Sequence, residues 1–139
     1  METKVTLHYK ADEAYYTVNK SGNRTEIDML KENKQAMSPT ELLLSGVIAC
    51  AAVDIVSMIK KRRKTFVDIR GTASGTRRDE FPRKFTNIHI HYDIFSPDLT
   101  EEEAGKLIDL AVEKYCSVAA TINESTILTH GFAIHRGES

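Results

Sequence analysis

The stretch from residue 38 to residue 64 most constrains the fold, because it predicts one long helix with a marked start and end. Ser38 suits the N-cap position, Pro39 suits the first helical turn, and Glu41 completes a capping box with Ser38. Nearly every residue up to Ile59 is apolar or small, and five consecutive cations follow. A helix that is apolar on all faces is expected to be buried. We therefore predict the central helix of a small domain.

Length and charge limit the class of protein. The chain has 139 residues, which predicts a single domain over residues 1–139. It carries 19 Lys and Arg against 20 Asp and Glu, so the charge balance does not indicate a nucleic-acid partner. Asp54 lies within the apolar stretch and argues against a membrane span. No apolar leader follows the first residues, and we expect a cytoplasmic protein with no cofactor and no metal.

Hydrophobic periodicity predicts the remaining elements. Alternation is clearest in 85–95, where isoleucines and Tyr92 share one face. Thr100 and Glu103 form a second capping box, which starts an amphipathic helix that ends at Cys116. The other predicted strands are 3–9, 14–18, 24–30, 65–74 and 127–135, and a short helix is expected over 117–122. This order predicts an α+β fold: three strands in an antiparallel meander, the long helix, a two-strand hairpin, the second helix and a last strand. One small sheet cannot cover the long helix on all sides, which indicates a second subunit.

The two cysteines are the candidates for chemistry. Cys50 lies within the long helix, and Cys116 lies at the end of the helix expected to pack against it. Packed helix axes lie about 8–10 Å apart, so the two sulfurs can be neighbours. Spacing alone favours two small buried hydrophobic residues. The functional alternative is a redox pair, in which one thiolate becomes a sulfenic acid and the other thiol condenses with it to a disulfide that an external thiol reduces.

Two segments resemble the OsmC/Ohr family. The first is Ser38-Pro-Thr-Glu-Leu-Leu-Leu-Ser-Gly-Val-Ile-Ala-Cys50-Ala-Ala, and the second is Ala111-Val-Glu-Lys-Tyr-Cys116-Ser-Val-Ala. The resemblance implies an OsmC-like fold in an intertwined homodimer. It also implies reduction of peroxides, with organic hydroperoxides as substrates and a small thiol or dithiol as reductant. In these terms Cys50 is the peroxidatic cysteine and Cys116 the resolving one.

Three departures from the family pattern keep an alternative open. Thr40 follows the proline where the peroxidase branches have Glu, and Glu41 comes one position later. Glu41 is therefore a candidate catalytic residue whose capping role is the stronger physical account. Ser117 replaces a usual proline, and no Arg can be assigned to the active site. The alternatives are a non-catalytic OsmC-like protein that binds a small ligand and a structural domain with buried cysteines.

Histidines provide weaker signals. His89, His91 and Asp93 share one face of the strand over 85–95, as metal ligands can. Alternating polar residues are also typical of a solvated sheet face, which is the interpretation we favour. His130 carries no signal that the sequence reveals. The basic run after Ile59 is explained by its place at a helix C-terminus, where cations are favourable.

Overall fold

The computed structural model describes residues 1–137 and divides the chain into two compact units, Met1–Leu43 and Leu44–Ser139. That the two form a single domain stays a prediction from the sequence.

The first unit contains a three-stranded antiparallel sheet with strands β1 (Val5–Ala11), β2 (Ala14–Asn19) and β3 (Arg24–Asp28) in that order. This confirms the predicted meander. Asn19 organises the turn between β2 and β3, because its side-chain oxygen accepts hydrogen bonds from the backbone N–H groups of Ser21 and Asn23. A short polar turn of this kind lets neighbouring strands pair directly.

The connection that follows β3 is held by one buried carboxylate. Asp28 accepts hydrogen bonds from the backbone N–H groups of Gln35 (2.8 Å) and Ala36 (2.9 Å) and from that of Leu30 (3.1 Å). The ammonium group of Lys34 lies 3.1 Å from the same carboxylate. Burial acts to raise the pKa of Asp28, but the donation from Gln35 and the contact with Lys34 outweigh it, so the pKa lies below its ordinary value.

The long helix α1 (Pro39–Lys61) contributes one buried stripe to the second unit. Its fully buried residues recur every four positions: Val47, Ala51, Ile55 and Ile59. The sequence predicted burial on all faces, whereas Val53 is 69% exposed in the single chain. By length and composition α1 can cross a membrane. Its buried stripe nevertheless belongs to the hydrophobic core, together with residues of the sheet.

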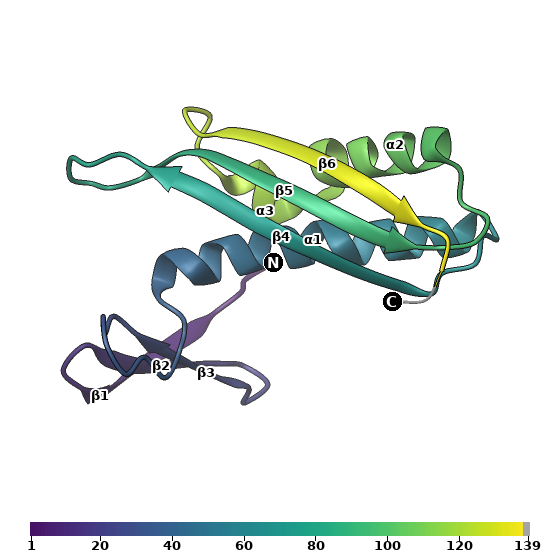
Figure 1. The fold of residues 1–139 in the computed structure, drawn as a ribbon. Coiled ribbons are helices and arrows are strands. Elements are labelled where there is room, and N and C mark those ends of the chain that lie inside the picture. The colour runs from purple at the N-terminus through teal and green to yellow at the C-terminus, as the bar shows by residue number, and fades with distance from the viewer. Residues whose placement is uncertain (138–139) are drawn as a thin grey trace. The chain divides into compact units, whose positions relative to one another are not determined.

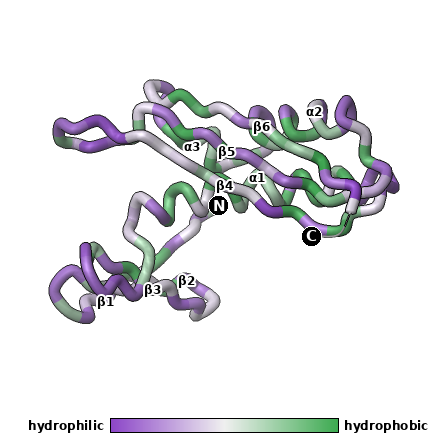
Figure 2. Tube along the Cα trace, viewed as in Figure 1, coloured by the Kyte–Doolittle hydropathy of each residue, from purple (hydrophilic) through white to green (hydrophobic). Residues whose placement is uncertain are grey.

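The second sheet has the strand order β4 (Asp68–Arg77), β5 (Phe85–Phe95), β6 (Ile127–His135). The pair β4–β5 is antiparallel, as predicted for a hairpin, although β4 begins three residues later than expected. The pair β5–β6 is parallel, a departure from the otherwise antiparallel pattern. Parallel neighbours need a long crossover, which the helices between β5 and β6 supply. Figure 1 shows α1 and α2 on one face of this sheet, and Figure 2 shows the hydrophilic tip of the β4–β5 hairpin.

The alternation of β5 explains why the helices lie on that face. Ile88, Ile90, Tyr92 and Ile94 are all buried, which confirms the predicted core face. The crossover consists of α2 (Glu101–Leu110), a π-helical turn η1 (Ala111–Tyr115) and α3 (Ser117–Thr121). The predicted capping box of Thr100 and Glu103 is present at the start of α2. Cys116 closes the π-helical turn, because its backbone N–H donates to the carbonyl of Ala111 at 2.9 Å.

Candidate functional site

Cys116 lies in the core of the second unit, where the π-helical turn meets α3. Cys116 is 2% exposed. The backbone N–H of Ala119 donates to its sulfur at 3.3 Å, so the side chain caps α3. The sulfur also lies 3.9 Å from the carbonyl oxygen of Val47 in α1, to which the thiol donates. These contacts hold the sulfur between the start of one helix and the backbone of another.

Cys50 lies on α1, is partly exposed and contacts Cys116. Burial raises the pKa of the Cys116 thiol, and the backbone N–H of Ala119 opposes the rise. A hydrogen bond with the Cys50 side chain and the charge that Cys50 can carry raise it further. The structure thus brings the two thiols together, one of them accessible and the other buried.

Tyr92 adds a hydroxyl group that sequence reasoning missed. It is 1% exposed and donates a hydrogen bond to the carbonyl oxygen of Ile48 at 2.6 Å. Burial raises the pKa of Tyr92, and the negative charges that Cys116 and Cys50 can carry raise it further, so the hydroxyl stays protonated near both thiols. In the sequence Tyr92 is one apolar member of an alternating strand, and that pattern hides its polar end.

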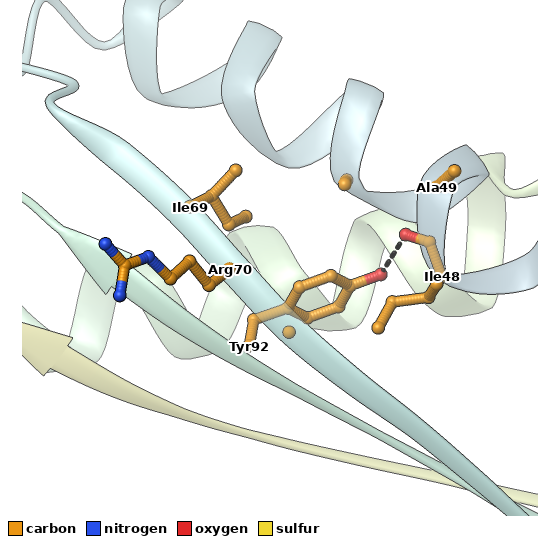
Figure 3. Close-up of a pocket in the computed structure, with 7 residues that line it drawn as sticks. Ile48, Ala49, Ile69, Arg70 and Tyr92 are labelled. Atoms are coloured by element: carbon orange, nitrogen blue, oxygen red, sulfur yellow. Dashed lines mark hydrogen bonds between the residues drawn. The ribbon is translucent and has the colours of Figure 1, made fainter. Parts of the chain in front are cut away.

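A pocket with a cavity volume of about 180 Å³ lies between α1 and β4 (Figure 3). Its wall is mostly apolar: the lining residues are Ile48, Ala49, Ala52, Ile69, Arg70, Gly71 and Tyr92. The guanidinium group of Arg70 points away from the other lining residues and lies 3.5 Å from Asp68 (Figure 3). Cys50 directly follows Ala49 in α1, although it does not itself line the pocket. The arrangement suits a small, mainly apolar molecule.

Gly71 permits the close packing of this wall. A Cβ atom at this position would lie 2.8 Å from the carbonyl oxygen of His91, 3.0 Å from Ile48 Cδ1 and 3.2 Å from Tyr92 Cδ1. All three distances are shorter than ordinary van der Waals contact. The absence of a side chain therefore lets β4 approach α1 and Tyr92 closely at this point.

The predicted site residue Glu41 lies in the first unit, where its carboxylate is engaged at the start of α1. It accepts hydrogen bonds from the backbone N–H and the hydroxyl of Ser38, both at 2.9 Å, and lies 3.9 Å from Lys34. The hydrogen bond from the Ser38 backbone lowers the pKa of Glu41, so the group is an ionised cap. The predicted capping box is confirmed.

The predicted solvated face of β5 is also confirmed. His89 is exposed and lies 2.7 Å from the hydroxyl of Thr129. Asp93 lies 2.9 Å from His135 and 3.5 Å from His91. The pKa of Asp93 is lowered, first by its hydrogen bond with His135. These polar groups are satisfied by one another.

Comparison with known proteins identifies the family. The family model described as OsmC-like protein matches residues 31–130. The chain belongs to the OsmC-like family. Protein YhfA of Escherichia coli strain K12 is 35% identical over 114 residues, which cover 82% of this chain and 84% of YhfA. The two motifs around Cys50 and Cys116 therefore indicated the correct family.

Solved structures confirm the OsmC-like fold. A hypothetical protein from Aquifex aeolicus VF5 has a TM-score of 0.86 and 27% identity, with 97% of this chain and 98% of that chain covered. An organic hydroperoxide resistance protein from Elizabethkingia anophelis has a TM-score of 0.74 and 19% identity, with 97% of each chain covered. At that identity the second likeness shows the fold and not the activity.

Proposed function

We propose that this OsmC-like protein is a cysteine-based peroxide reductase in which Cys50 is the peroxidatic cysteine and Cys116 the resolving one. The observation that carries the proposal is the contact between an accessible thiol and a buried one in the same unit. A two-cysteine peroxidase needs this arrangement, because the first sulfur has to reach the peroxide and the second has to reach the oxidised sulfur.

The proposed reaction has three steps. The Cys50 thiolate attacks one oxygen of the peroxide, the O–O bond breaks, and the alkoxide leaves and takes up a proton as an alcohol. Cys50 is then a sulfenic acid. The Cys116 sulfur attacks the Cys50 sulfur, and the hydroxyl group leaves with a proton as water. An external thiol or dithiol finally reduces the Cys50–Cys116 disulfide through a mixed disulfide.

An organic hydroperoxide is the substrate class that the surroundings favour. The neighbouring pocket offers a mostly apolar wall. Structural relatives include proteins named for organic hydroperoxide resistance. We also propose that the protein forms a homodimer and that it is cytoplasmic. The homodimer is supported by the exposure of apolar Val53 on α1 in the single chain. A catalytic role for Glu41 stays a prediction from the family motif, because its contacts support the helix cap.

Intact mass after exposure of the reduced protein to stoichiometric cumene hydroperoxide tests the proposal. The wild type should lose two hydrogens, about 2 Da, as the disulfide forms. Cys116→Ser should instead accumulate a sulfenic acid at Cys50 that dimedone traps, and Cys50→Ser should not consume peroxide. An unchanged wild-type mass, or full peroxide consumption by Cys50→Ser, would overturn the proposal.

The second candidate is a non-catalytic protein that binds a small apolar ligand. Thr40, which stands where peroxidase branches have Glu, favours this function. Inert thiols together with saturable binding of a small apolar probe beside Arg70 would support it. Loss of that binding in Arg70→Ala, with unchanged folding, would assign the pocket.

A further inference from the structure

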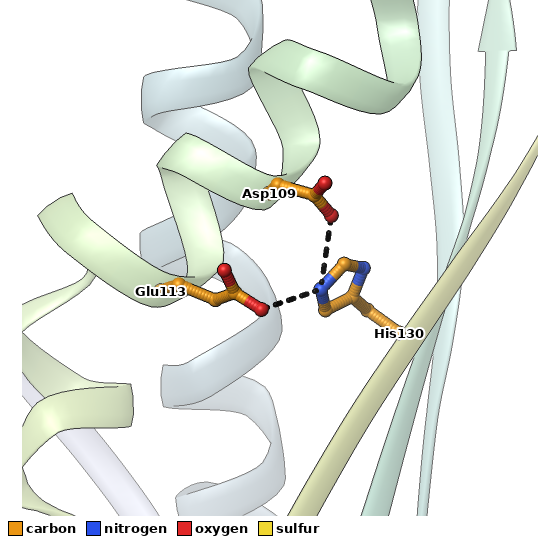
Figure 4. Close-up of side chains that lie close together, drawn as sticks. All are labelled: Asp109, Glu113 and His130. Atoms are coloured by element: carbon orange, nitrogen blue, oxygen red, sulfur yellow. Dashed lines mark ion pairs between the residues drawn. The ribbon is translucent and has the colours of Figure 1, made fainter.

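Three side chains that the thiol chemistry does not use converge between the crossover helices and β6 in the second unit. Asp109 lies in α2, Glu113 in the π-helical turn and His130 in β6 (Figure 4). One ligand atom from each lies within 4.8 Å of the others. The two carboxylates both approach the same imidazole nitrogen: Asp109 Oδ1 is 3.5 Å and Glu113 Oε1 3.9 Å from His130 Nε2.

His130 stands where β6 otherwise places apolar side chains. Leu128, Phe132 and Ile134 on the same face of the strand pack against the hydrophobic core. The His130 side chain is 17% exposed, so the polar ring is mostly covered at the edge of that face. A histidine held in a largely apolar row, with two carboxylates aimed at it, is unlike the solvated histidines of β5.

The two carboxylates lie close to each other and face the same ring. Like charges four residues apart on a helix repel each other. Among residues 1–137 the ionic partner of both Asp109 and Glu113 is His130, while the nearby Lys106 pairs with Glu102. A divalent cation would neutralise both carboxylates at once.

The separations between the ligand atoms are compatible with a shared metal ion once the exposed carboxylates move toward it. A tetrahedral Zn²⁺ with bonds of about 2.0–2.2 Å keeps neighbouring ligand atoms about 3.3–3.6 Å apart. The two distances to His130 Nε2, 3.5 and 3.9 Å, lie at or just above this spacing, and all three ligand atoms lie within 4.8 Å of one another, so the exposed carboxylates have to approach by a short distance. By contrast, His135 in β6 lies 2.9 Å from Asp93 in β5, which is an ordinary hydrogen bond and too short for two ligands of such an ion.

We propose that Asp109, Glu113 and His130 form a binding site for a divalent first-row transition-metal ion of the Zn²⁺ type, with water in the remaining position. The imidazole favours such ions over Mg²⁺ and Ca²⁺, which prefer oxygen ligands. The ion would fasten the π-helical turn, which leads directly into Cys116, to strand β6. The proposal does not depend on peroxide reduction.

Titration calorimetry with Zn²⁺ tests the site. The protein carries Cys50→Ser and Cys116→Ser, so that no thiolate competes for the metal, and it is first stripped with a chelator. One site per chain is expected. Asp109→Asn or His130→Gln should weaken binding by at least about tenfold, because even loss of an indirect partner of a metal typically costs that much. Glu102→Gln, the same change of charge on the same helix, should bind as before.

A spectrum of the wild type with Co²⁺ keeps the test valid if the cysteine variant does not fold. Ligation by nitrogen and oxygen gives visible d–d bands without a thiolate charge-transfer band, and His130→Gln should abolish those d–d bands. Three outcomes would each overturn the proposal. The folded cysteine variant could fail to bind Zn²⁺, or Asp109→Asn could bind as well as Glu102→Gln. In the Co²⁺ spectrum, a thiolate band could appear that His130→Gln leaves unchanged.

Discussion

The hydroxyl of Tyr92 in β5 donates a hydrogen bond to the backbone carbonyl of Ile48 in α1, at 2.6 Å (Figure 3). The bond joins the central strand of the second sheet to the helix that carries Cys50, two residues before it. The phenol ring packs in the core, and its polar end lies near both thiols. The backbone turn that presents Cys50 is therefore held from the sheet side by one side chain.

Replacement of Tyr92 by Phe should lower stability, because it removes the buried hydrogen bond from the Tyr92 hydroxyl to the Ile48 carbonyl. We expect a loss of about 1–2 kcal/mol in the free energy of unfolding, measured by urea denaturation. Tyr115→Phe is the matched control, since Tyr115 is 51% exposed, and its stability should stay within about 0.5 kcal/mol of the wild type. Equal stability of the two variants would show that the hydrogen bond contributes nothing net.

Gly71→Ala should destabilise the second unit, whereas Gly46→Ala should not. A methyl group at position 71 would meet a carbonyl oxygen at 2.8 Å, and the strand has to move to admit it. Overpacking of this kind costs about 1–3 kcal/mol. At Gly46, within α1, the nearest atom to an added Cβ is 3.8 Å away, so alanine should stabilise the helix by up to about 1 kcal/mol. Thermal unfolding of both variants measures the difference, and a stable Gly71→Ala protein would contradict the packing described for the pocket wall.

The two thiols should react with iodoacetamide in a fixed order. Burial raises the pKa of Cys116, so less of it is thiolate at neutral pH, and the reagent also cannot reach it easily. Cys50 is partly exposed and should be alkylated first. Peptide mass spectrometry over a time course gives both rates. Raising the pH should speed labelling of Cys116, and prior labelling of Cys116 at neutral pH would contradict the assigned burial.

Asp28→Asn should destabilise the first unit in a pH-dependent way. The folded pKa of Asp28 lies below its ordinary value of 3.8, so its contribution is fully present above that value and is lost as pH falls through the folded pKa. At neutral pH we expect a lower free energy of unfolding than for the wild type, because three backbone donors and Lys34 lose a charged acceptor. The gap between variant and wild type should shrink at acidic pH.

The control for this prediction is Asp12→Asn. Asp12 is exposed and accepts a hydrogen bond from Tyr9, which an amide oxygen can also accept. The free energy of unfolding of Asp12→Asn should stay within about 0.5 kcal/mol of the wild-type value at every pH. A gap for Asp28→Asn that does not change with pH would mean that the fold depends on the shape of this side chain and not on its charge.

Local rules predicted most of the elements from the sequence. The Ser38 and Thr100 capping boxes marked both helix starts, and the alternation of 85–95 identified the buried face of β5. Each of these patterns depends on residues a few positions apart, whose geometry the backbone of one helix or strand determines. The motifs around Cys50 and Cys116 likewise identified the family, because they are short contiguous segments.

Strand pairing and the neighbours of individual side chains depend on contacts between segments that are distant in the sequence. No local sequence pattern predicts those contacts. The alternating pattern of β5 does not indicate a role for the Tyr92 hydroxyl, because its hydrogen-bond partner Ile48 lies in α1. His130 likewise has two carboxylate neighbours only because the crossover helix lies beside β6. The parallel pairing of β6 with β5 likewise follows from the path of that crossover. By itself, then, the sequence determined the helices, most of the strands and the candidate cysteines. The tertiary structure decided which side chains surround those cysteines, because packing, and not spacing along the chain, sets the distances between elements.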